Sequence, residues 1–174
     1  MLRQFEAEDG RLINCRIQGT GPPLLFMAPG WGCGGNLYAQ SLRSLNRYRT
    51  LIVPDPRGSG GSPEIQRHLI NVEQHAQDIW SICNALKLST IDLAGHSNGG
   101  WSAIIAAIVE PERVDNLILL NPEIEPDEGF ELAQSATVSA KLNDPLCTMG
   151  AQAIVEASET GFQNISSDED LADY

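Results

Sequence analysis

The chain has 174 residues and a mass of 18.9 kDa, which suits one domain with one sizeable core. Its hydrophobic fraction of 42% and mean hydropathy of −0.16 exclude a mainly disordered chain, and no apolar run has the length of a membrane span. The formal net charge of −12 argues against nucleic acid and anionic membranes as partners, because phosphate contacts need a basic surface.

The first expected element is an antiparallel hairpin arm in residues 10–19, where apolar and polar residues alternate loosely between two glycines. Four short, continuous apolar runs are typical of buried parallel strands. They occupy residues 24–28, 50–54, 90–94 and 116–120. Segments of helix length separate these runs, so the sequence predicts an α/β fold with a mostly parallel sheet and flanking helices.

Two of the connecting segments carry clear helix signals. Residues 71–74 (Asn-Val-Glu-Gln) resemble a capping box, and apolar residues recur after it at steps of three and four. Residues 101–109 are almost wholly apolar and stop before Pro111, so we expect that helix to be buried.

The charge changes abruptly near residue 121. Residues 1–120 carry a net charge of −1, whereas residues 121–174 hold twelve acidic residues and one basic residue, Lys141. The sequence therefore predicts two parts: a core in residues 1–122, and an acidic, helical, cap-like segment with a frayed end in residues 123–174.

Cysteine usage and the N-terminus bear on the compartment. The first ten residues lack the apolar segment of a secretory signal. The four cysteines are scattered without C-x-x-C spacing, at Cys15, Cys33, Cys83 and Cys147. We therefore expect a cytoplasmic protein with reduced thiols and without a zinc site.

The strongest motif is a G-x-S-x-G sequence between an apolar run and an apolar helix, with Ser97 at its centre. A serine on a tight strand-to-helix turn is held in a strained conformation that exposes its hydroxyl, and Gly95 and Gly99 allow strand and helix to approach. The N–H of Asn98 then faces an oxyanion formed at Ser97. The alternative is a simple glycine-rich turn.

A second motif, Pro-Gly-Trp-Gly-Cys-Gly-Gly, follows the first apolar run in residues 29–35. As an oxyanion loop, it would place the backbone N–H of Trp31, next to Gly30, as a second donor. The same residues match G-x-G-x-x-G, and Asp55 lies 20 residues after Gly35, which is the spacing of a dinucleotide-binding fingerprint. Bulky Trp31 stands against the second interpretation, because the pyrophosphate must approach the backbone closely there.

A third motif, Asp-Pro-Arg-Gly-Ser-Gly-Gly-Ser, occupies residues 55–62 after the second run. Asp55 and Arg57 can brace this loop, and its glycines permit a tight path beside an active site. A plain surface turn is the alternative.

These three motifs, in this order, resemble the α/β-hydrolase superfamily, and most of all its esterase, lactonase and haloperoxidase-like branch. The likeness covers about residues 5–122 and includes the segments Gly-Thr-Gly-Pro-Pro-Leu-Leu (residues 19–25) and Pro-Glu-Arg-Val-Asp-Asn-Leu-Ile-Leu-Leu-Asn (residues 111–121). Members of that branch usually open the oxyanion loop with His-Gly, whereas Pro29 replaces the histidine here and leaves the backbone donor in place.

The resemblance implies that Ser97 is the nucleophile and that the N–H groups of Trp31 and Asn98 form the oxyanion hole. The family also needs an acid and a histidine after the serine, and no histidine follows Ser97 in this sequence. We expect the three histidines to be structural: His68, His75 and His96. Glu123 and Glu125 follow the fourth run, where some hydrolases place the acid, but without a base they have nothing to orient.

Members of the family usually have about 250–300 residues and two further strands, so the resemblance implies a partial α/β-hydrolase fold in a truncated chain. We expect a serine hydrolase acting on a small ester or lactone, weak or inactive in this form, and this reaction implies no cofactor or metal. The alternatives are a catalytically dead small-molecule binding module and a dinucleotide-binding oxidoreductase fragment. A sheet that ends at the fourth run exposes an edge, which a homodimer would cover.

Overall fold

The computed structural model describes residues 1–29, 34–62, 66 and 69–124. Its contacts divide the chain into two units, Met1–Glu123 and Ile124–Tyr174, and the first of these is described below. The predicted helices of residues 123–174 lie outside the described residues.

A six-stranded sheet forms the centre of the first unit, in the order β1-β2-β4-β3-β5-β6. The hairpin comprises β1 (Leu2–Glu6) and β2 (Leu12–Gly19), and β2 also pairs antiparallel with β4 (Thr50–Pro54). The other neighbours are parallel and include β3 (Pro23–Met27), β5 (Ile91–His96) and β6 (Val114–Leu120). The prediction of a mostly parallel sheet with an N-terminal antiparallel arm is therefore confirmed.

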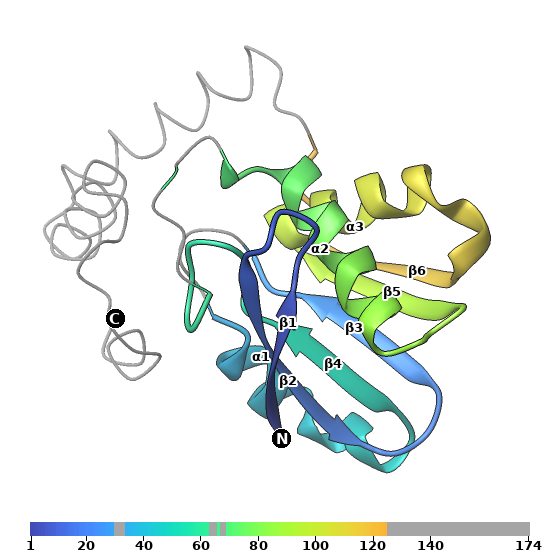
Figure 1. Ribbon diagram of the computed structural model, residues 1–174. Coiled ribbons are helices and arrows are strands. Elements are labelled where there is room, and N and C mark those ends of the chain that lie inside the picture. Colours follow the sequence, from blue (N-terminus) through green and yellow to red (C-terminus); the bar gives the residue numbers. More distant parts are fainter. Residues whose placement is uncertain (30–33, 63–65, 67–68, 125–174) are drawn as a thin grey trace, which may run out of the picture. The chain divides into compact units, whose positions relative to one another are not determined.

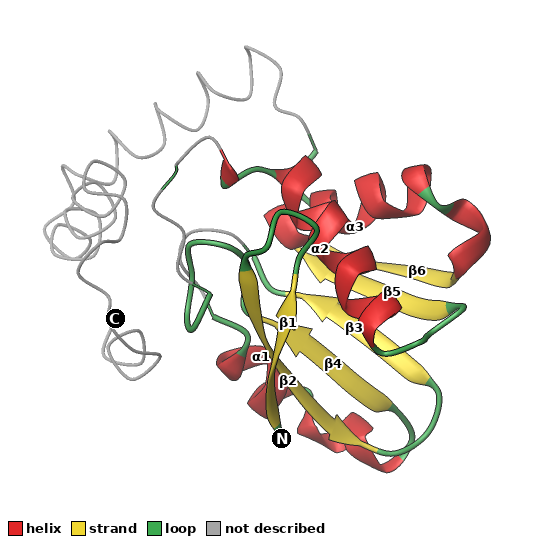
Figure 2. Cartoon of the chain, in the orientation of Figure 1, coloured by secondary structure: helices red, strands yellow, loops and turns green. Residues whose placement is uncertain are grey.

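Helices cover both faces of the sheet (Figures 1 and 2). On one face, α2 (Val72–Ala85) and α3 (Asn98–Val109) pack against alternate strand residues such as Leu25, Ile52 and Leu93. On the other face, α1 (Asn36–Ser41), together with Leu42 and Leu45 from the chain that follows it, packs against Leu24, Phe26 and Val53. The strand runs are continuously apolar because the central strands are buried on both faces.

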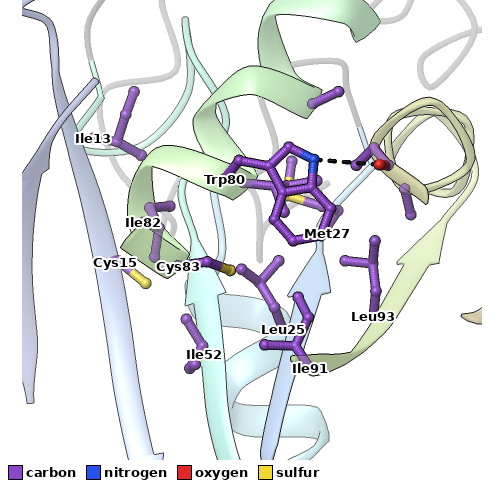
Figure 3. Packing of buried hydrophobic residues seen from close by; sticks show 14 of the residues in the cluster. Ile13, Cys15, Leu25, Met27, Ile52, Trp80, Ile82, Cys83, Ile91 and Leu93 are labelled. Atoms are coloured by element: carbon purple, nitrogen blue, oxygen red, sulfur yellow. Dashed lines mark hydrogen bonds between the residues drawn. The ribbon is translucent and has the colours of Figure 1, made fainter. Parts of the chain in front are cut away.

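The larger core lies between the sheet and the pair α2–α3 (Figure 3). Trp80 on α2 lies in it, and its indole Nε1 donates a hydrogen bond of 3.2 Å to the carbonyl oxygen of Ala106 on α3. The guanidinium of Arg113 lies over the Trp80 ring, 4.6 Å from the ring centroid. The hydrogen bond between Trp80 and Ala106 fixes α2 and α3 to each other.

Helix boundaries follow local chemistry, but burial does not always follow hydrophobicity. The predicted capping box begins α2, where the Asn71 side chain accepts a hydrogen bond from the Gln74 N–H. The expectation that the apolar helix is buried was only partly right: α3 turns small residues to the core, among them Ala103 and Ala106, and leaves Ile108 and Val109 exposed. Small residues allow α3 to lie close to the sheet, and that closeness shapes the turn before it.

Candidate active site

Ser97 lies on the turn between β5 and α3, where its backbone adopts φ 52° and ψ −126°. A positive φ is unfavourable for any residue with a Cβ, and such strain persists only where the surroundings enforce it. The residue is half-buried at the carboxyl end of a central strand and directly precedes the first residue of α3. Ser97 therefore lies in a strained turn at the end of the sheet where the parallel strands finish.

The flanking glycines make this turn possible because there is no room for a side chain. A Cβ on Gly95 would lie 2.3 Å from the carbonyl oxygen of Gly99, and a Cβ on Gly99 would lie 2.3 Å from that of Ala28 on the chain leaving β3. The end of β3, the end of β5 and the start of α3 are thus in backbone contact.

Hydrogen bonds hold the Ser97 backbone from both sides. Its N–H donates to the Leu120 carbonyl at the end of β6, and its own carbonyl accepts from the N–H groups of Gly100 (2.8 Å) and Glu123 (2.9 Å). Asn98 opens α3, so its N–H is among the helix donors that have no partner within the helix. Trp31, the other predicted donor of the oxyanion hole, and Gly30, a predicted support of its loop, lie outside the described residues.

Asp55 joins the loops around the turn. Its side chain is fully buried and accepts hydrogen bonds from the N–H of Gly35 (2.6 Å), from the N–H of Gly61 (2.9 Å) and from the Arg16 guanidinium. These contacts tie the residue before α1 to the glycine-rich loop after β4. A dinucleotide-binding acid must present its carboxylate to a ribose, and the Asp55 carboxylate is instead occupied by the protein's own donors.

Arg57 connects α2 with the turn between β1 and β2. Its guanidinium is buried and makes two hydrogen bonds to Asp78 on α2 and two to Asp9 in the turn between β1 and β2. Burial by itself lowers the pKa of Arg57, but these hydrogen bonds outweigh it and raise the pKa above its usual value. In turn, the hydrogen bond from Arg57 lowers the pKa of Asp9. Arg57 therefore fastens the hairpin to α2.

The two described histidines have different surroundings. His96, which precedes Ser97, lies with its Nδ1 2.7 Å from the Tyr38 hydroxyl of α1. His75 is buried on α2, and burial lowers its pKa from 6.5 to about 4. His68 and Glu125 lie outside the described residues. Sequence reasoning missed Tyr38, which belongs to no motif and meets His96 only through the fold.

Other chemistry is limited in the described part of the chain. No group of three His, Cys, Asp or Glu there is arranged to hold a metal ion. Cys15 and Cys83 are free, buried thiols, and burial raises the pKa of each to about 12. None of the described helices is long and apolar enough to cross a membrane.

Comparison with known proteins agrees with the fold. Residues 23–144 match the model of the alpha/beta hydrolase fold. The magnesium-chelatase 30 kDa subunit of Rhodobacter capsulatus is 30% identical over 120 residues, covering 67% of this chain and 42% of that protein. Serine hydrolase BPHL of Mus musculus is 34% identical over 117 residues, covering 65% of this chain and 40% of that protein.

A solved structure has a similar fold. A thermophilic esterase from Thermogutta terrifontis superposes with a TM-score of 0.65 at 26% identity, covering 83% of this chain and 54% of that one. The chain thus spans about half the length of the relatives that it matches.

Proposed function

Because the chain belongs to the alpha/beta hydrolase fold family, we propose that it carries the nucleophile half of a serine hydrolase acting on small esters or lactones. The observation that carries this proposal is the backbone of Ser97, a non-glycine residue at φ 52° between β5 and the N-terminus of α3. Strain of this kind stabilises nothing in the fold, and it is typical of a side chain held out for reaction.

In the proposed reaction, Ser97 Oγ attacks the substrate carbonyl and loses its proton to a histidine base. The negative charge that develops on the carbonyl oxygen is stabilised by the N–H of Asn98 and, as the sequence predicts, by that of Trp31. Collapse of the tetrahedral intermediate expels the alcohol, which takes up the proton. Water then releases the acyl group by the same steps, and the serine regains its proton.

The base is the missing part. All three histidines of the sequence precede Ser97; His96 is hydrogen-bonded to Tyr38, and His75 is buried on α2. We therefore expect this chain by itself to be a weak or inactive hydrolase, with only the small residual rate that oxyanion stabilisation provides.

Asp55 takes a supporting part in the proposal, because it holds the Gly35 N–H and the Gly61 N–H on one buried carboxylate. Arg57 supports the fold through its hydrogen bonds to Asp78 and Asp9. Neither carboxylate nor guanidinium acts on substrate in this scheme.

A second copy of the chain is the proposed partner at the sheet edge. In the described residues β6 pairs with β5 along one side, and it exposes apolar side chains at Leu117, Ile118, Leu119 and Leu120. A homodimer that pairs the two edges would cover part of this surface.

The engagement of His96 by Tyr38 and the burial of His75 favour a second candidate function, a module that binds a small molecule near Ser97 without turnover. Saturable binding of an ester that is never hydrolysed, unchanged in Ser97→Ala, would support it.

Fluorophosphonate labelling followed by intact-mass measurement tests the main proposal, since the probe phosphonylates an activated serine much faster than an ordinary one. We expect slow formation of a single adduct that is absent in Ser97→Ala and retained in the control Ser89→Ala, whose serine is exposed. Rapid turnover of an ester that depends on Ser97 would show that a base is present. A folded chain without any adduct would contradict the proposed reactivity of Ser97 and would leave an inactive fragment or a binding module as the alternatives.

A further inference from the structure

The hydrogen bond between Tyr38 and His96 joins the first helix to the residue before the nucleophile. The Tyr38 hydroxyl lies 2.7 Å from His96 Nδ1, and the two ring centroids are 5.8 Å apart. We propose that Tyr38 is a positioning residue for Ser97 and acts through His96. This inference rests on the proposed role of Ser97 as nucleophile.

Tyr38 is itself firmly held, so it can serve as an anchor. Its ring stacks on Phe26 of β3 at a centroid distance of 5.0 Å. The helix around it is fixed at the next residue: the Ala39 N–H donates to the Gly35 carbonyl, and the Ala39 carbonyl accepts from the Gln18 side chain of β2. Gly35 is in turn bonded to the buried Asp55. The hydroxyl thus belongs to a part of the protein that is attached to β2, β3 and β4.

The strained turn needs an anchor on this side of the sheet. The hydrogen bonds of the Ser97 backbone are made with Leu120 at the end of β6, with Gly100 and Trp101 in α3, and with Glu123. Tyr38 approaches from the opposite face, because α1 packs on the side of Phe26 and Ala94. A conformation at φ 52° is kept only where its neighbours over-determine it. Fixing the His96 ring prevents the last residue of β5 from rotating and relaxing the turn.

This role predicts an effect on bond formation and not on probe binding. Tyr38→Phe keeps the ring that stacks on Phe26 and removes only the hydroxyl, while His96→Leu removes the ring nitrogen. We expect each to lower the maximal rate of Ser97 phosphonylation about tenfold, as for the loss of one hydrogen bond, with the probe's half-saturation concentration unchanged. The exposed Tyr48 offers the matched control, and Tyr48→Phe leaves the rate as it is.

Two further variants separate positioning from general loss of structure. His96→Asn places a polar atom where Nδ1 lies, so it should restore most of the rate that His96→Leu loses. The double variant Tyr38→Phe/His96→Leu should be no slower than either single variant, because both remove the same interaction. Additive losses, or equal losses in His96→Asn and His96→Leu, would overturn the proposal.

A second measurement separates this inference from the proposed function. If the wild-type chain takes no label, the activation of Ser97 fails, and amide hydrogen exchange measured by NMR then decides the role of Tyr38. We expect Tyr38→Phe to accelerate exchange of the Ser97 and Gly100 amides about tenfold relative to Tyr48→Phe, since both amides belong to the hydrogen bonds of the turn. Exchange at wild-type rates at these amides would overturn the proposal whether or not the chain is labelled.

Discussion

Two neighbouring strands of the sheet have similar sequences and opposite surroundings. On β5, Leu93 is fully buried, whereas Leu117, its partner in the parallel register of β6, is 39% exposed. The same contrast holds along the strands, because β3 and β4 are buried on both faces and Leu117–Leu120 are 37–45% exposed. An apolar run therefore predicts a strand but does not reveal how many layers cover it.

The largest expected change in the free energy of unfolding comes from truncating Leu93, with the truncation of Leu117 as its comparison. Leu93 lies in the core between the sheet, α2 and α3 (Figure 3), so Leu93→Ala should lower the free energy of unfolding by about 3 kcal/mol through lost burial and a cavity. Leu117→Ala removes the same atoms from a surface that is already partly wet and should cost about 1 kcal/mol. Urea unfolding monitored by circular dichroism gives both values.

Equal losses in the two variants would mean that β6 is covered as completely as β5 in solution. A change in the urea m-value in either variant would instead indicate that the unfolded state or the two-state transition has changed.

Acid should destabilise the protein through His75, which is buried on α2. Burial lowers its pKa from 6.5 to about 4, and its surroundings include the Arg57 backbone, which accepts a hydrogen bond, and the Arg57 guanidinium, which repels a positive ring. The unfolded chain therefore binds a proton at a pH where the folded chain does not. The contribution of His75 to the free energy of unfolding is therefore present above pH 6.5 and is lost as the pH falls toward 4. The decrease between pH 7 and pH 5 is about 2 kcal/mol.

The variant His75→Gln isolates this contribution, because it removes the titrating group and keeps a polar side chain. The unfolding free energy of wild type minus that of His75→Gln should decrease by about 2 kcal/mol from pH 7 to pH 5. A difference independent of pH would show that the His75 pKa is near 6.5 in the folded protein.

Much of the fold could be predicted because its signals are local. Continuous apolar runs predicted the strands, and the Asn71 cap predicted the start of α2. The burial of α3 could not be predicted, because apolar residues surround the whole helix and the pattern does not show which side meets the core; the structure places Ala103 and Ala106 there. Coverage depends on residues far away in sequence.

The candidate site divides in the same way. The spacing of Gly95, Ser97 and Gly99 predicted a tight turn, because the glycines let strand and helix approach and the serine between them lies on the turn. The contacts of Tyr38 with His96 and of Arg57 with Asp9 join residues 58 and 48 positions apart. No local pattern marks such pairs, so only the topology of the sheet brings them together.

The smallest expected change in stability, and the most direct test of the β6 edge, comes from Ile118→Lys. Ile118 is 44% exposed on the edge strand, so the substitution should change the unfolding free energy of the protomer by less than about 1 kcal/mol. If a second copy pairs with this edge, a lysine there opposes pairing by its charge and hydration. We expect sedimentation velocity to show concentration-dependent dimers for wild type and a dissociation constant at least tenfold higher for Ile118→Lys.

Leu2→Lys is the matched control, because Leu2 is an exposed apolar residue on β1, the strand at the opposite edge of the sheet. Both variants change the net charge of the chain by the same amount, so a general effect of charge on association would appear in both. Loss of dimers in Ile118→Lys alone assigns the contact to β6. Equal loss in both variants would attribute association to charge, and a wild-type chain that stays monomeric at every concentration would show that the exposed side chains of β6 do not drive pairing of two copies.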